Sequence, residues 1–343
     1  MTRPSLDYPL DSSPAPGTLL PVTDGIAWTR SPLPMQLDHI NLWLLREDQG
    51  WSVVDTGMNT SDARNAWDQL ADTQLGEHGL QRVIVTHMHP DHAGLAGWLV
   101  QRWHCDFYMS RTDYLMCRVL ASDPAGEPPR DAIRFYRAAG FDQQTLDIYS
   151  KRFGGFGKAV GALPNSYHRL RHGEVLESPG HRWTLVEGNG HAPEHICLLD
   201  RDSNILIAGD QLLPTISPNV SVWPTEPEAN PLADWIESCG RLARLVDSQT
   251  LVLPAHGKPF RGAPERLHWL IDQHLTTVEQ LADACHTPRR VVDLIPMIFT
   301  RKLDPINYMM ATGETLAHLH YLIATGGASR ELDGDGVAWY RST

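Results

Sequence analysis

The sequence predicts a layered α/β fold followed by a small, mainly helical C-terminal domain. Two observations favour it: β-branched runs alternate with helical patterns between residues 40 and 254, and the pattern becomes almost wholly helical from about residue 264. The chain of 343 residues is long enough for one large core and a smaller second one. We therefore expect a first domain over residues 1–262 and a C-terminal domain over residues 263–343.

The first domain opens with an irregular segment and continues with strands. Residues 1–35 contain seven prolines and little periodicity, so we expect an extended arm that wraps onto the core. Helices are predicted from Thr60, with Trp67 and Leu70 on one face, and over residues 91–103. Strands are predicted at residues 40–45, 51–55, 82–86, 105–109, 183–187, 195–199, 204–208 and 251–254.

A helical insertion is predicted over residues 111–167, with breaks at residues 123–126 and 154–157. It holds eight of the chain's sixteen phenylalanine and tyrosine residues. One interpretation is that these aromatic side chains pack the insertion onto the body of the protein. The other is that several of them line a lid or an apolar pocket over the active site.

The last part of the chain predicts helices and one hairpin. Asn230 and Pro231 start a helix as a cap residue and a first-turn proline. Further helices are expected from Pro264, over residues 289–298, and from Thr312 to about residue 326, with a hairpin over residues 330–340. Three helices and a hairpin suggest a winged-helix-like domain. Because this region holds seven Lys and Arg against ten Asp and Glu, we favour a packing, pocket-closing or dimerising role over DNA binding.

Composition limits the classes of function. The formal net charge is −12, whereas nucleic-acid-binding proteins present clusters of basic residues to the phosphates. We therefore do not expect a nucleic-acid partner. The N-terminus is polar and rich in proline, and no apolar run approaches the roughly 20 residues that cross a bilayer, so we expect no membrane partner. The five cysteines are scattered and odd in number, which fits a protein of the reducing cytoplasm.

The most informative segment is Thr86-His87-Met88-His89-Pro90-Asp91-His92-Ala93-Gly94, which follows a β-branched run. Four metal-capable side chains fall within six residues, which is far more specific than a single histidine. Three later segments each end a strand with another such residue: His191 after Gly188-Asn189-Gly190, Asp210 after Ala208-Gly209, and His256 after Pro254-Ala255. Strand ends are where α/β sheets present their chemistry.

These segments, in this order, resemble the metallo-β-lactamase superfamily, whose opening motif is matched by Val54-Asp55-Thr56-Gly57. The resemblance covers roughly residues 20–262. It implies a four-layer αβ/βα sandwich with a dinuclear metal site at the shared edge of two facing sheets. It further implies that Asp55 orients ligands without binding metal itself. His195, four residues after His191, supports either the site or the fold.

The resemblance also implies which residues bind which ion. One ion takes His87, His89 and His191, a second takes Asp91, His92 and His256, and Asp210 bridges the two. Imidazole and carboxylate ligands without sulfur suit Zn²⁺, and also Mn²⁺, Fe²⁺ or Co²⁺. The implied mechanism uses a metal-bound water whose pKa falls towards about 7. We assign catalytic roles to Asp91, which would orient this nucleophile and shuttle its proton, and to Asp210.

Two prominent branches of the superfamily are disfavoured. The diiron branch carries Glu at the position of His89, and the commonest true β-lactamases carry Cys at the position of Asp210. The pattern is similar to glyoxalase II-like thioesterases and lactonases, although the glutathione-binding residues of glyoxalase II have no match in the tail. We therefore expect a small-molecule acyl substrate and hydrolysis of a thioester, lactone or related carboxyl ester.

Two alternatives stay open. A phosphodiesterase or nuclease of the β-lactamase-like endoribonuclease type shares the motifs and the tail, and would need the basic doublets at residues 289–290 and 301–302 beside the metals. A non-enzymatic binding module would need missing ligands, and none is missing. The remaining histidines are expected to be surface or packing residues: His168, His172, His181, His268, His274, His286, His318 and His320.

Overall fold

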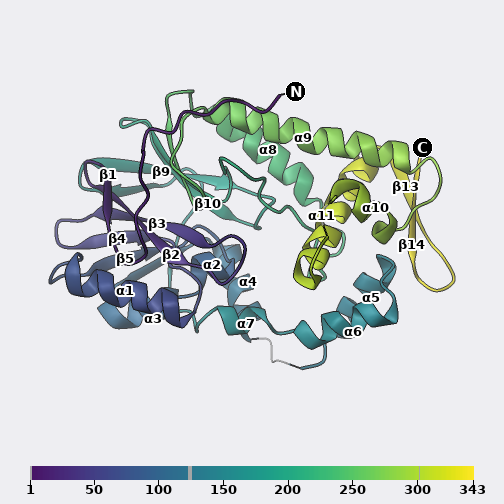
Figure 1. Cartoon of the computed structure of the whole chain (residues 1–343), viewed down its shortest axis with the longest axis horizontal. Coiled ribbons are helices and arrows are strands. Elements are labelled where there is room, and N and C mark those ends of the chain that lie inside the picture. The colour runs from purple at the N-terminus through teal and green to yellow at the C-terminus, as the bar shows by residue number, and fades with distance from the viewer. Residues whose placement is uncertain (1, 123–125, 301) are drawn as a thin grey trace.

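Two mixed β-sheets face each other in the first part of the chain (Figure 1). The computed structural model describes residues 2–122, 126–300 and 302–343. The first sheet contains, in spatial order, β1 (Leu20–Thr23), β2 (Ile26–Pro32), β3 (His39–Arg46), β4 (Trp51–Val54), β5 (Leu80–Ile84), β6 (Asp106–Met109) and β7 (His168–Arg169). The second contains β12 (Leu251–Pro254), β11 (Ile205–Gly209), β10 (His195–Asp200), β9 (His181–Gly188) and β8 (Val175–Ser178). The predicted layered α/β fold is confirmed.

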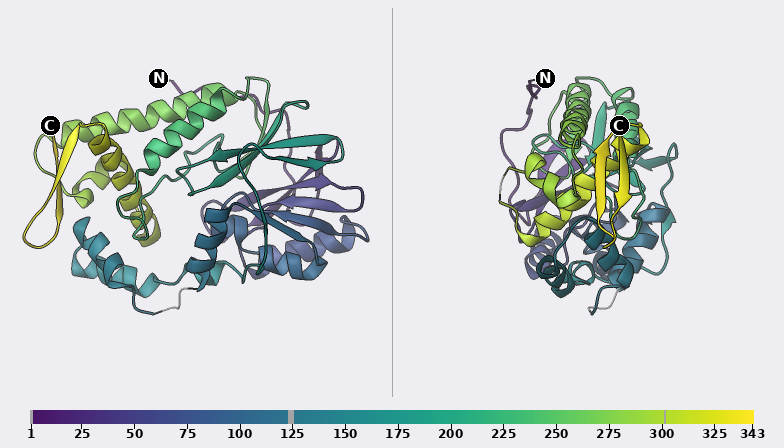
Figure 2. Two further views of the ribbon diagram at one scale, coloured as in Figure 1. Left: turned by 180° about the vertical axis from the view of Figure 1, so that it is seen from behind. Right: turned by 90° about the vertical axis from the view of Figure 1, so that its right-hand side faces the viewer.

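Helices cover the outer face of each sheet (Figure 2). α1 (Ser61–Thr73) and α3 (Ala96–Trp103) pack on the first sheet, and α8 (Pro231–Ala243) and α9 (Ala263–Ala284) on the second. Buried side chains from both sheets fill the space between them, among them Trp28, Trp43 and Trp183. Local sequence explains the helix starts, since Thr60 caps α1 and Asn230 caps α8, as predicted.

The N-terminal segment differs from the prediction of an arm over residues 1–35. Residues 20–32 form the hairpin β1–β2 at the edge of the first sheet, and Trp28 is fully buried there. The two strands are joined at Asp24-Gly25, where Gly25 has a φ of +72°. A glycine in the left-handed region is typical of tight hairpins. In the sequence, the prolines around this segment favour an irregular arm over a hairpin. Only residues 2–19 run as an arm along the body.

The helical insertion divides between two neighbours. Its helices are α4 (Arg111–Ser122), α5 (Arg130–Ala138), α6 (Gln143–Arg152) and α7 (Phe156–Ala159). Side chains of α4 and α7 join the core beneath the first sheet. By contrast, Tyr136, Phe141 and Leu146 form a separate cluster that packs against Tyr308 and Met309 of the C-terminal region. The predicted break at residues 123–126 falls mostly outside the described residues.

The C-terminal domain contains α10 (Val291–Ile298), α11 (Pro305–Ala324) and the predicted hairpin, β13 (Ala328–Leu332) with β14 (Ala338–Ser342). The predicted start of α11 at Thr312 is wrong. The helix begins two turns earlier, where Asp304 accepts hydrogen bonds from the backbone N–H groups of Ile306 and Asn307. This cap, followed by Pro305, is a regular start signal that the sequence interpretation overlooked.

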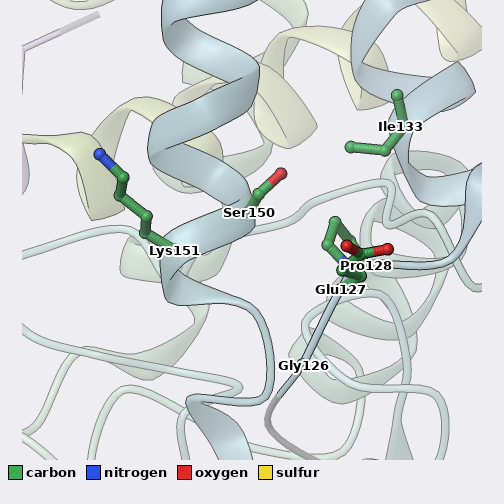
Figure 3. A pocket seen from close by; sticks show the side chains of 6 residues that line it. All are labelled: Gly126, Glu127, Pro128, Ile133, Ser150 and Lys151. Carbon is green, nitrogen blue, oxygen red and sulfur yellow. The ribbon is translucent and has the colours of Figure 1, made fainter.

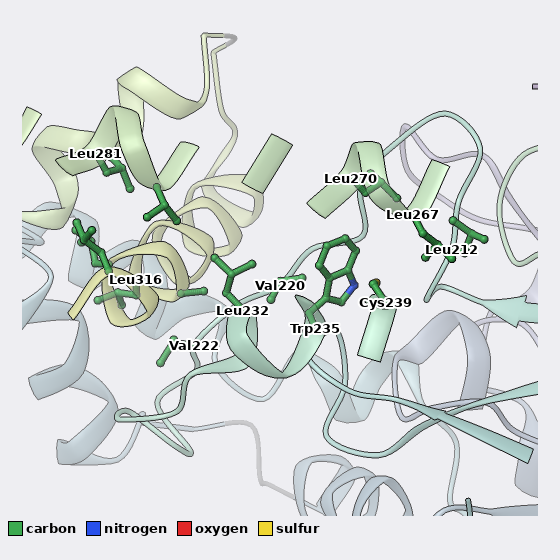
Figure 4. Packing of buried hydrophobic residues seen from close by; sticks show 14 of the residues in the cluster. Leu212, Val220, Val222, Leu232, Trp235, Cys239, Leu267, Leu270, Leu281 and Leu316 are labelled. Carbon is green, nitrogen blue, oxygen red and sulfur yellow. The ribbon is translucent and has the colours of Figure 1, made fainter. Parts of the chain in front are cut away.

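The C-terminal domain and the second sheet share one core (Figure 4). Trp235 and Leu232 of α8, Leu267 and Leu270 of α9, and Leu316 of α11 belong to the same buried cluster. α9 contributes to both parts, because it packs on α8 along one stretch and on α10 and α11 along another. The boundary at residue 262 therefore stays a prediction. Among the described residues, no helix is both long and apolar enough to cross a membrane.

Candidate metal centre

The seven predicted ligands come together where strands of both sheets end. His87 and His89 follow β5, and Asp91 and His92 lie in the short helix α2 (Pro90–Ala93). In the second sheet, the remaining three ligands follow β9, β11 and β12: His191, Asp210 and His256. The side chains form three overlapping groups whose donor atoms lie within 4.8 Å of one another.

Three histidines form a tight triangle of nitrogen atoms. His89 Nδ1 lies 2.9 Å from His87 Nε2 and 2.9 Å from His191 Nε2. The third side, between His191 Nε2 and His87 Nε2, is 3.2 Å. Nitrogen donors held at about 2.0–2.1 Å from one metal ion stand roughly 2.9–3.4 Å apart, so the triangle has the dimensions of one face of a coordination shell.

A second group contains Asp91, His92 and His256. His256 Nε2 lies 3.3 Å from Asp91 Oδ2, and His92 Nε2 lies 3.7 Å from the same oxygen. Asp210 faces both groups. Its Oδ2 is 3.2 Å from His191 Nε2, whereas its Oδ1 is 3.5 Å from His256 Nε2 and 3.6 Å from His92 Nε2. The two carboxylate oxygens of Asp210 thus point at different sets of donors.

Hydrogen bonds on the outer side of the rings leave the inner nitrogens free to bind a metal. His191 Nδ1 donates to the carbonyl of Asn219 at 2.7 Å, and His256 Nδ1 donates to the carbonyl of His39 at 2.9 Å. His92 Nδ1 lies 2.8 Å from Asp55 Oδ2. A ring whose outer nitrogen carries the proton presents a lone pair on its inner nitrogen, which is the form that a metal ion requires.

Two inner atoms lack any other use. His92 Nε2 and Asp210 Oδ1 are buried and have no hydrogen-bond partner among the described residues. Leaving a buried polar atom without a partner costs about 1–3 kcal/mol, which makes such atoms rare in a folded core. A cation between the two groups would satisfy both, and the donor set of imidazole and carboxylate fits a divalent transition metal.

Burial and neighbouring charges favour the metal-binding protonation states of His87, His89 and Asp91. Burial lowers the pKa of His87 well below its usual value and that of His89 to about 3, so both are neutral at pH 7. Burial alone would raise the pKa of Asp91, but His92 and His256 outweigh it and lower that pKa to about 2. The carboxylates in turn raise the pKa of His92 and His256 against the effect of burial, so a bound cation would take the place of a proton there.

In the structure, Asp55 and His195 both lie behind the predicted ligands. Asp55 accepts a hydrogen bond from the backbone N–H of Thr86 at 2.8 Å, beside its contact with His92. His195 Nε2 accepts from the backbone N–H of Asp210 at 3.1 Å and belongs to none of the ligand groups. A side chain at Gly209 would come within 2.4 Å of His195, so glycine is required next to Asp210.

The helix predicted over residues 91–103 is two helices in the structure. α2 ends at Ala93 and α3 starts at Ala96, with Gly94 between them. A Cβ on Gly94 would lie 2.7 Å from both the carbonyl oxygen of Gly57 and the backbone nitrogen of Asn59. The backbone at Gly94 therefore passes directly against the turn at residues 57–59, which glycine permits. The helical path breaks one residue later, at Leu95, where φ is −102° and ψ is 5°.

The sequence interpretation missed Asp113, the third residue of α4. Its carboxylate is fully buried and accepts hydrogen bonds from the backbone N–H of Met88 at 2.8 Å and of Glu194 at 2.7 Å. Met88 lies between His87 and His89, so one side chain connects the two loops that carry the first triangle of ligands. Burial raises the pKa of Asp113 to about 6. No local pattern marks this residue, because both partners are distant in sequence.

Two arginines hold the loop that follows Asp210. Arg266 donates to the carbonyls of Leu213 and Ile216, and Arg3 of the N-terminal arm donates to those of Pro214 and Thr215. Four consecutive carbonyl groups are thus taken by two guanidinium groups. Arg266 is fully buried, and burial lowers its pKa to about 10.

A hollow of about 400 Å³ lies between α5 and α6 and shares no residue with the ligand cluster (Figure 3). It is lined by Gly126, Glu127, Pro128, Ile133, Ser150 and Lys151. Figure 3 shows the Lys151 amine pointing away from Glu127. Because none of the seven predicted ligands lines it, we assign it no part in the chemistry.

Comparison with known proteins agrees with the geometry. Residues 35–284 match the family described as Metallo-beta-lactamase superfamily. The chain belongs to the metallo-β-lactamase superfamily. Residues 278–343 match a second family, described as Metallo-beta-lactamase-like, C-terminal domain, so the superfamily fold is followed by a domain that also occurs in other members.

Solved structures of the superfamily superpose over nearly the whole chain. A beta-lactamase domain protein from Burkholderia ambifaria is 40% identical with a TM-score of 0.92, and the match covers 98% of both chains. The metallo-beta-lactamase family protein TTHA1429 from Thermus thermophilus is 28% identical with a TM-score of 0.78, covering 94% of this chain and 99% of that one.

Curated relatives include hydrolases. "Probable metallo-hydrolase YqjP" of Bacillus subtilis is 25% identical over 337 residues, covering 92% of this chain and 97% of its own. "Acyl-coenzyme A thioesterase MBLAC2" of Gallus gallus is 26% identical over 275 residues, covering 78% of this chain and 87% of its own. The superfamily and the His/Asp cluster agree with the predicted class, a metal-dependent hydrolase.

Proposed function

We propose that this protein is a dinuclear metal-dependent hydrolase that cleaves thioesters, with lactones and related carboxyl esters as further substrates of the same chemistry. The observation that carries the dinuclear part is Asp210, whose two oxygens face separate groups of donors. His87, His89 and His191 would hold one ion, and Asp91, His92 and His256 the other. Zn²⁺ is the metal we favour for these ligands.

Two bound divalent ions would supply Lewis acidity towards a water molecule and a substrate carbonyl. The protein's own groups then have defined tasks. Asp91 is the more open of the two carboxylates, with 18% of its side chain exposed against 10% for Asp210. We therefore assign to Asp91 the orientation of the attacking water and the transfer of its proton to the leaving group, and to Asp210 the spacing of the two ligand groups.

The thioester assignment draws support from relatives. The MBLAC2 proteins of Gallus gallus and Homo sapiens are 26% and 27% identical to this chain and are described as acyl-coenzyme A thioesterases. In the insertion, Tyr136 and Phe141 stack on each other with centroids 4.9 Å apart and pack against the C-terminal domain. Tyr136 and Phe141 therefore serve packing. We propose that the acyl chain binds elsewhere, beside the strand ends that carry the predicted metal ligands.

The phosphodiesterase alternative has weaker support. Arg290 of the first basic doublet donates to Asp293 at 2.7 Å, which neutralises much of its charge. Arg301 of the second doublet lies outside the described residues. We propose a winged-helix-like arrangement for α9–α11 and the hairpin, and a packing role for it, because the domain shares its core with the second sheet.

Elemental analysis of the purified protein, combined with a substrate screen, tests the proposal. We expect about two metal ions per chain, hydrolysis of acyl thioesters in preference to β-lactams and phosphodiesters, and loss of activity in His89→Ala. A wild-type chain that binds no metal after supplementation would refute the dinuclear site. A metal-loaded enzyme that cleaves only phosphodiesters would refute the substrate class.

A further inference from the structure

The outer nitrogen of one predicted ligand is held by a loop without regular secondary structure. His191 Nδ1 donates to the backbone carbonyl of Asn219 at 2.7 Å. Asn219 lies between β11 and α8 and belongs to no helix or strand. The orientation of the His191 ring therefore depends on what fixes this part of the loop.

Both ends of the Asn219 side chain are fixed. Ser221 Oγ donates to Asn219 Oδ1 at 2.6 Å, and Asn219 Nδ2 donates to Glu314 Oε2 at 2.9 Å. Glu314 lies in α11 of the C-terminal domain. Asn219 thus connects Glu314 of the C-terminal domain to His191 through two hydrogen bonds, one from its side chain and one to its backbone carbonyl.

The loop and α11 are in close contact around these hydrogen bonds. The backbone N–H of Val222 donates to the carbonyl of Gly313 at 3.1 Å. A Cβ on Gly313 would lie 2.7 Å from the carbonyl oxygen of Val222 and 2.8 Å from Ser221 Cβ, so only glycine permits this approach. The contact between Asn219 and Glu314 is therefore part of a built interface rather than an isolated meeting of two surface side chains.

We propose that Glu314 is a positioning residue of the metal centre: it holds Asn219, and through the Asn219 carbonyl it sets the orientation of His191. The inference rests on the proposed metal site and deepens it, since it makes the C-terminal domain part of that site. Outer hydrogen-bond partners of metal-binding histidines fix the ring and its tautomer.

The chemistry of Glu314 suggests the variants to use. Burial raises the pKa of Glu314 to about 7, although the hydrogen bond from Asn219 opposes this shift. Either protonation form keeps an oxygen that accepts from Asn219. Glutamine offers the same acceptor without the charge, so Glu314→Gln is the conservative variant and Glu314→Ala removes the contact. Glu331→Gln, in the exposed strand β13, is the matched control.

The experiment measures Zn²⁺ binding to the full chain by chelator competition and elemental analysis, with thermal unfolding of the metal-free variants alongside. In Glu314→Ala we expect one of the two binding steps to weaken about 10-fold, at the lower end of the roughly 10- to 100-fold effect of outer partners. The second step should stay unchanged, and Glu314→Gln and Glu331→Gln should bind like the wild type. Asn219→Ala should show the same defect, and the double variant no more than either single one.

Three outcomes would overturn the proposal. Glu314→Ala could bind both ions as the wild type does, or weaken both steps equally in parallel with a lower melting temperature, which is a purely structural effect. Failure of Glu314→Gln to restore binding would also contradict it. Because the readout is metal binding, absence of thioesterase activity in a wild type that binds two ions would refute only the substrate class.

Discussion

Asp210 and Asp113 are both buried carboxylates of the candidate metal centre, but they face different partners. Asp210 turns its oxygens towards three imidazole nitrogens, and Oδ1 has no hydrogen-bond donor among the described residues. Asp113 accepts two backbone N–H groups. The first arrangement is completed by a cation, whereas the second is complete as it stands, so substitution should affect them differently.

Replacing Asp210 should affect metal binding first. In Asp210→Ala both donor groups lose a shared oxygen, so we expect loss of both ions or of nearly all turnover, measured by elemental analysis and by hydrolysis of the best substrate from the screen. The metal-free variant should still fold. Retention of two ions and full activity would contradict the bridging role.

Replacing Asp113 should affect stability first. Asp113→Ala leaves the backbone N–H groups of Met88 and Glu194 buried and unpaired, and each such group costs about 1–3 kcal/mol. We expect the free energy of unfolding to fall by about 2–4 kcal/mol in the metal-free protein, measured by urea titration. Asp131→Asn, at an exposed position of α5, is the control. A loss of less than about 0.5 kcal/mol would argue against the connecting role of Asp113.

The His/Asp cluster could be predicted from the sequence, whereas the residues that support it could not. His87, His89, Asp91 and His92 fall within six residues after a strand, so local spacing identifies them. Asn219 and Glu314 meet across 95 positions, and neither stands in a pattern of its own. Hydrogen bonds of this kind depend on how distant elements pack, which no local pattern encodes.

At the scale of elements, a chain of hydrogen bonds joins α9 and α11. Ser217 Oγ donates to His274 Nε2 at 3.1 Å, and His274 Nδ1 donates to His318 Nε2 at 3.0 Å. His318 Nδ1 then donates to the carbonyl of Glu314 at 2.7 Å. Each ring uses one nitrogen as donor and the other as acceptor, so the chain requires both histidines to be neutral.

This series of hydrogen bonds should make the free energy of unfolding sensitive to acid. Burial lowers the pKa of His274 to about 3 and that of His318 to about 4, whereas the unfolded chain protonates near 6.5. The stabilisation is therefore present above about pH 6.5 and is lost as pH falls, towards 4 for His318 and towards 3 for His274. Down to pH 5, each histidine should lower the free energy of unfolding by about 2 kcal/mol.

Urea titration of the metal-free protein from pH 7 to pH 5 checks this. His318→Gln should show a shallower loss of stability than the wild type, and His286→Gln, at an exposed position, should follow the wild type. If the free energy of unfolding falls equally steeply with pH in all three proteins, these buried histidines do not control the loss of stability in acid.

Elements with local signals were predicted well, and those shaped by packing were not. Thr60 and Asn230 are the N-cap residues of α1 and α8, and both helix starts could be predicted from them. The break between α2 and α3 falls at Leu95, whose backbone leaves the helical region, and no pattern in residues 91–103 marks it. Asp304-Pro305 is a different case, since that cap was present in the sequence and was overlooked.

At the scale of the whole molecule, the shared core predicts one unfolding transition. Leu319 of α11 is fully buried in the cluster that also contains Trp235 of α8. We expect Leu319→Ala to cost about 2–5 kcal/mol and to lower the melting temperature of the entire chain. Leu332→Ala, where the leucine is 65% exposed, should be nearly neutral.

Calorimetry and tryptophan fluorescence together test this. Coincident transitions that shift together in Leu319→Ala would support a single cooperative unit. Two separate transitions, of which Leu319→Ala shifts only one, would show that the C-terminal domain unfolds independently of the rest of the protein.

The division of the insertion between two neighbours has a consequence for chimaeras made from related proteins. α4 and α7 belong to the body, while the cluster of Tyr136 and Phe141 grips Tyr308 in α11, and α11 packs back onto the body through α9. The insertion therefore connects the body of the protein to the C-terminal region. Exchange of the insertion or the tail alone between homologues would replace one side of the contact between Tyr136, Phe141 and Tyr308, so the two segments should be exchanged together when chimaeras are built.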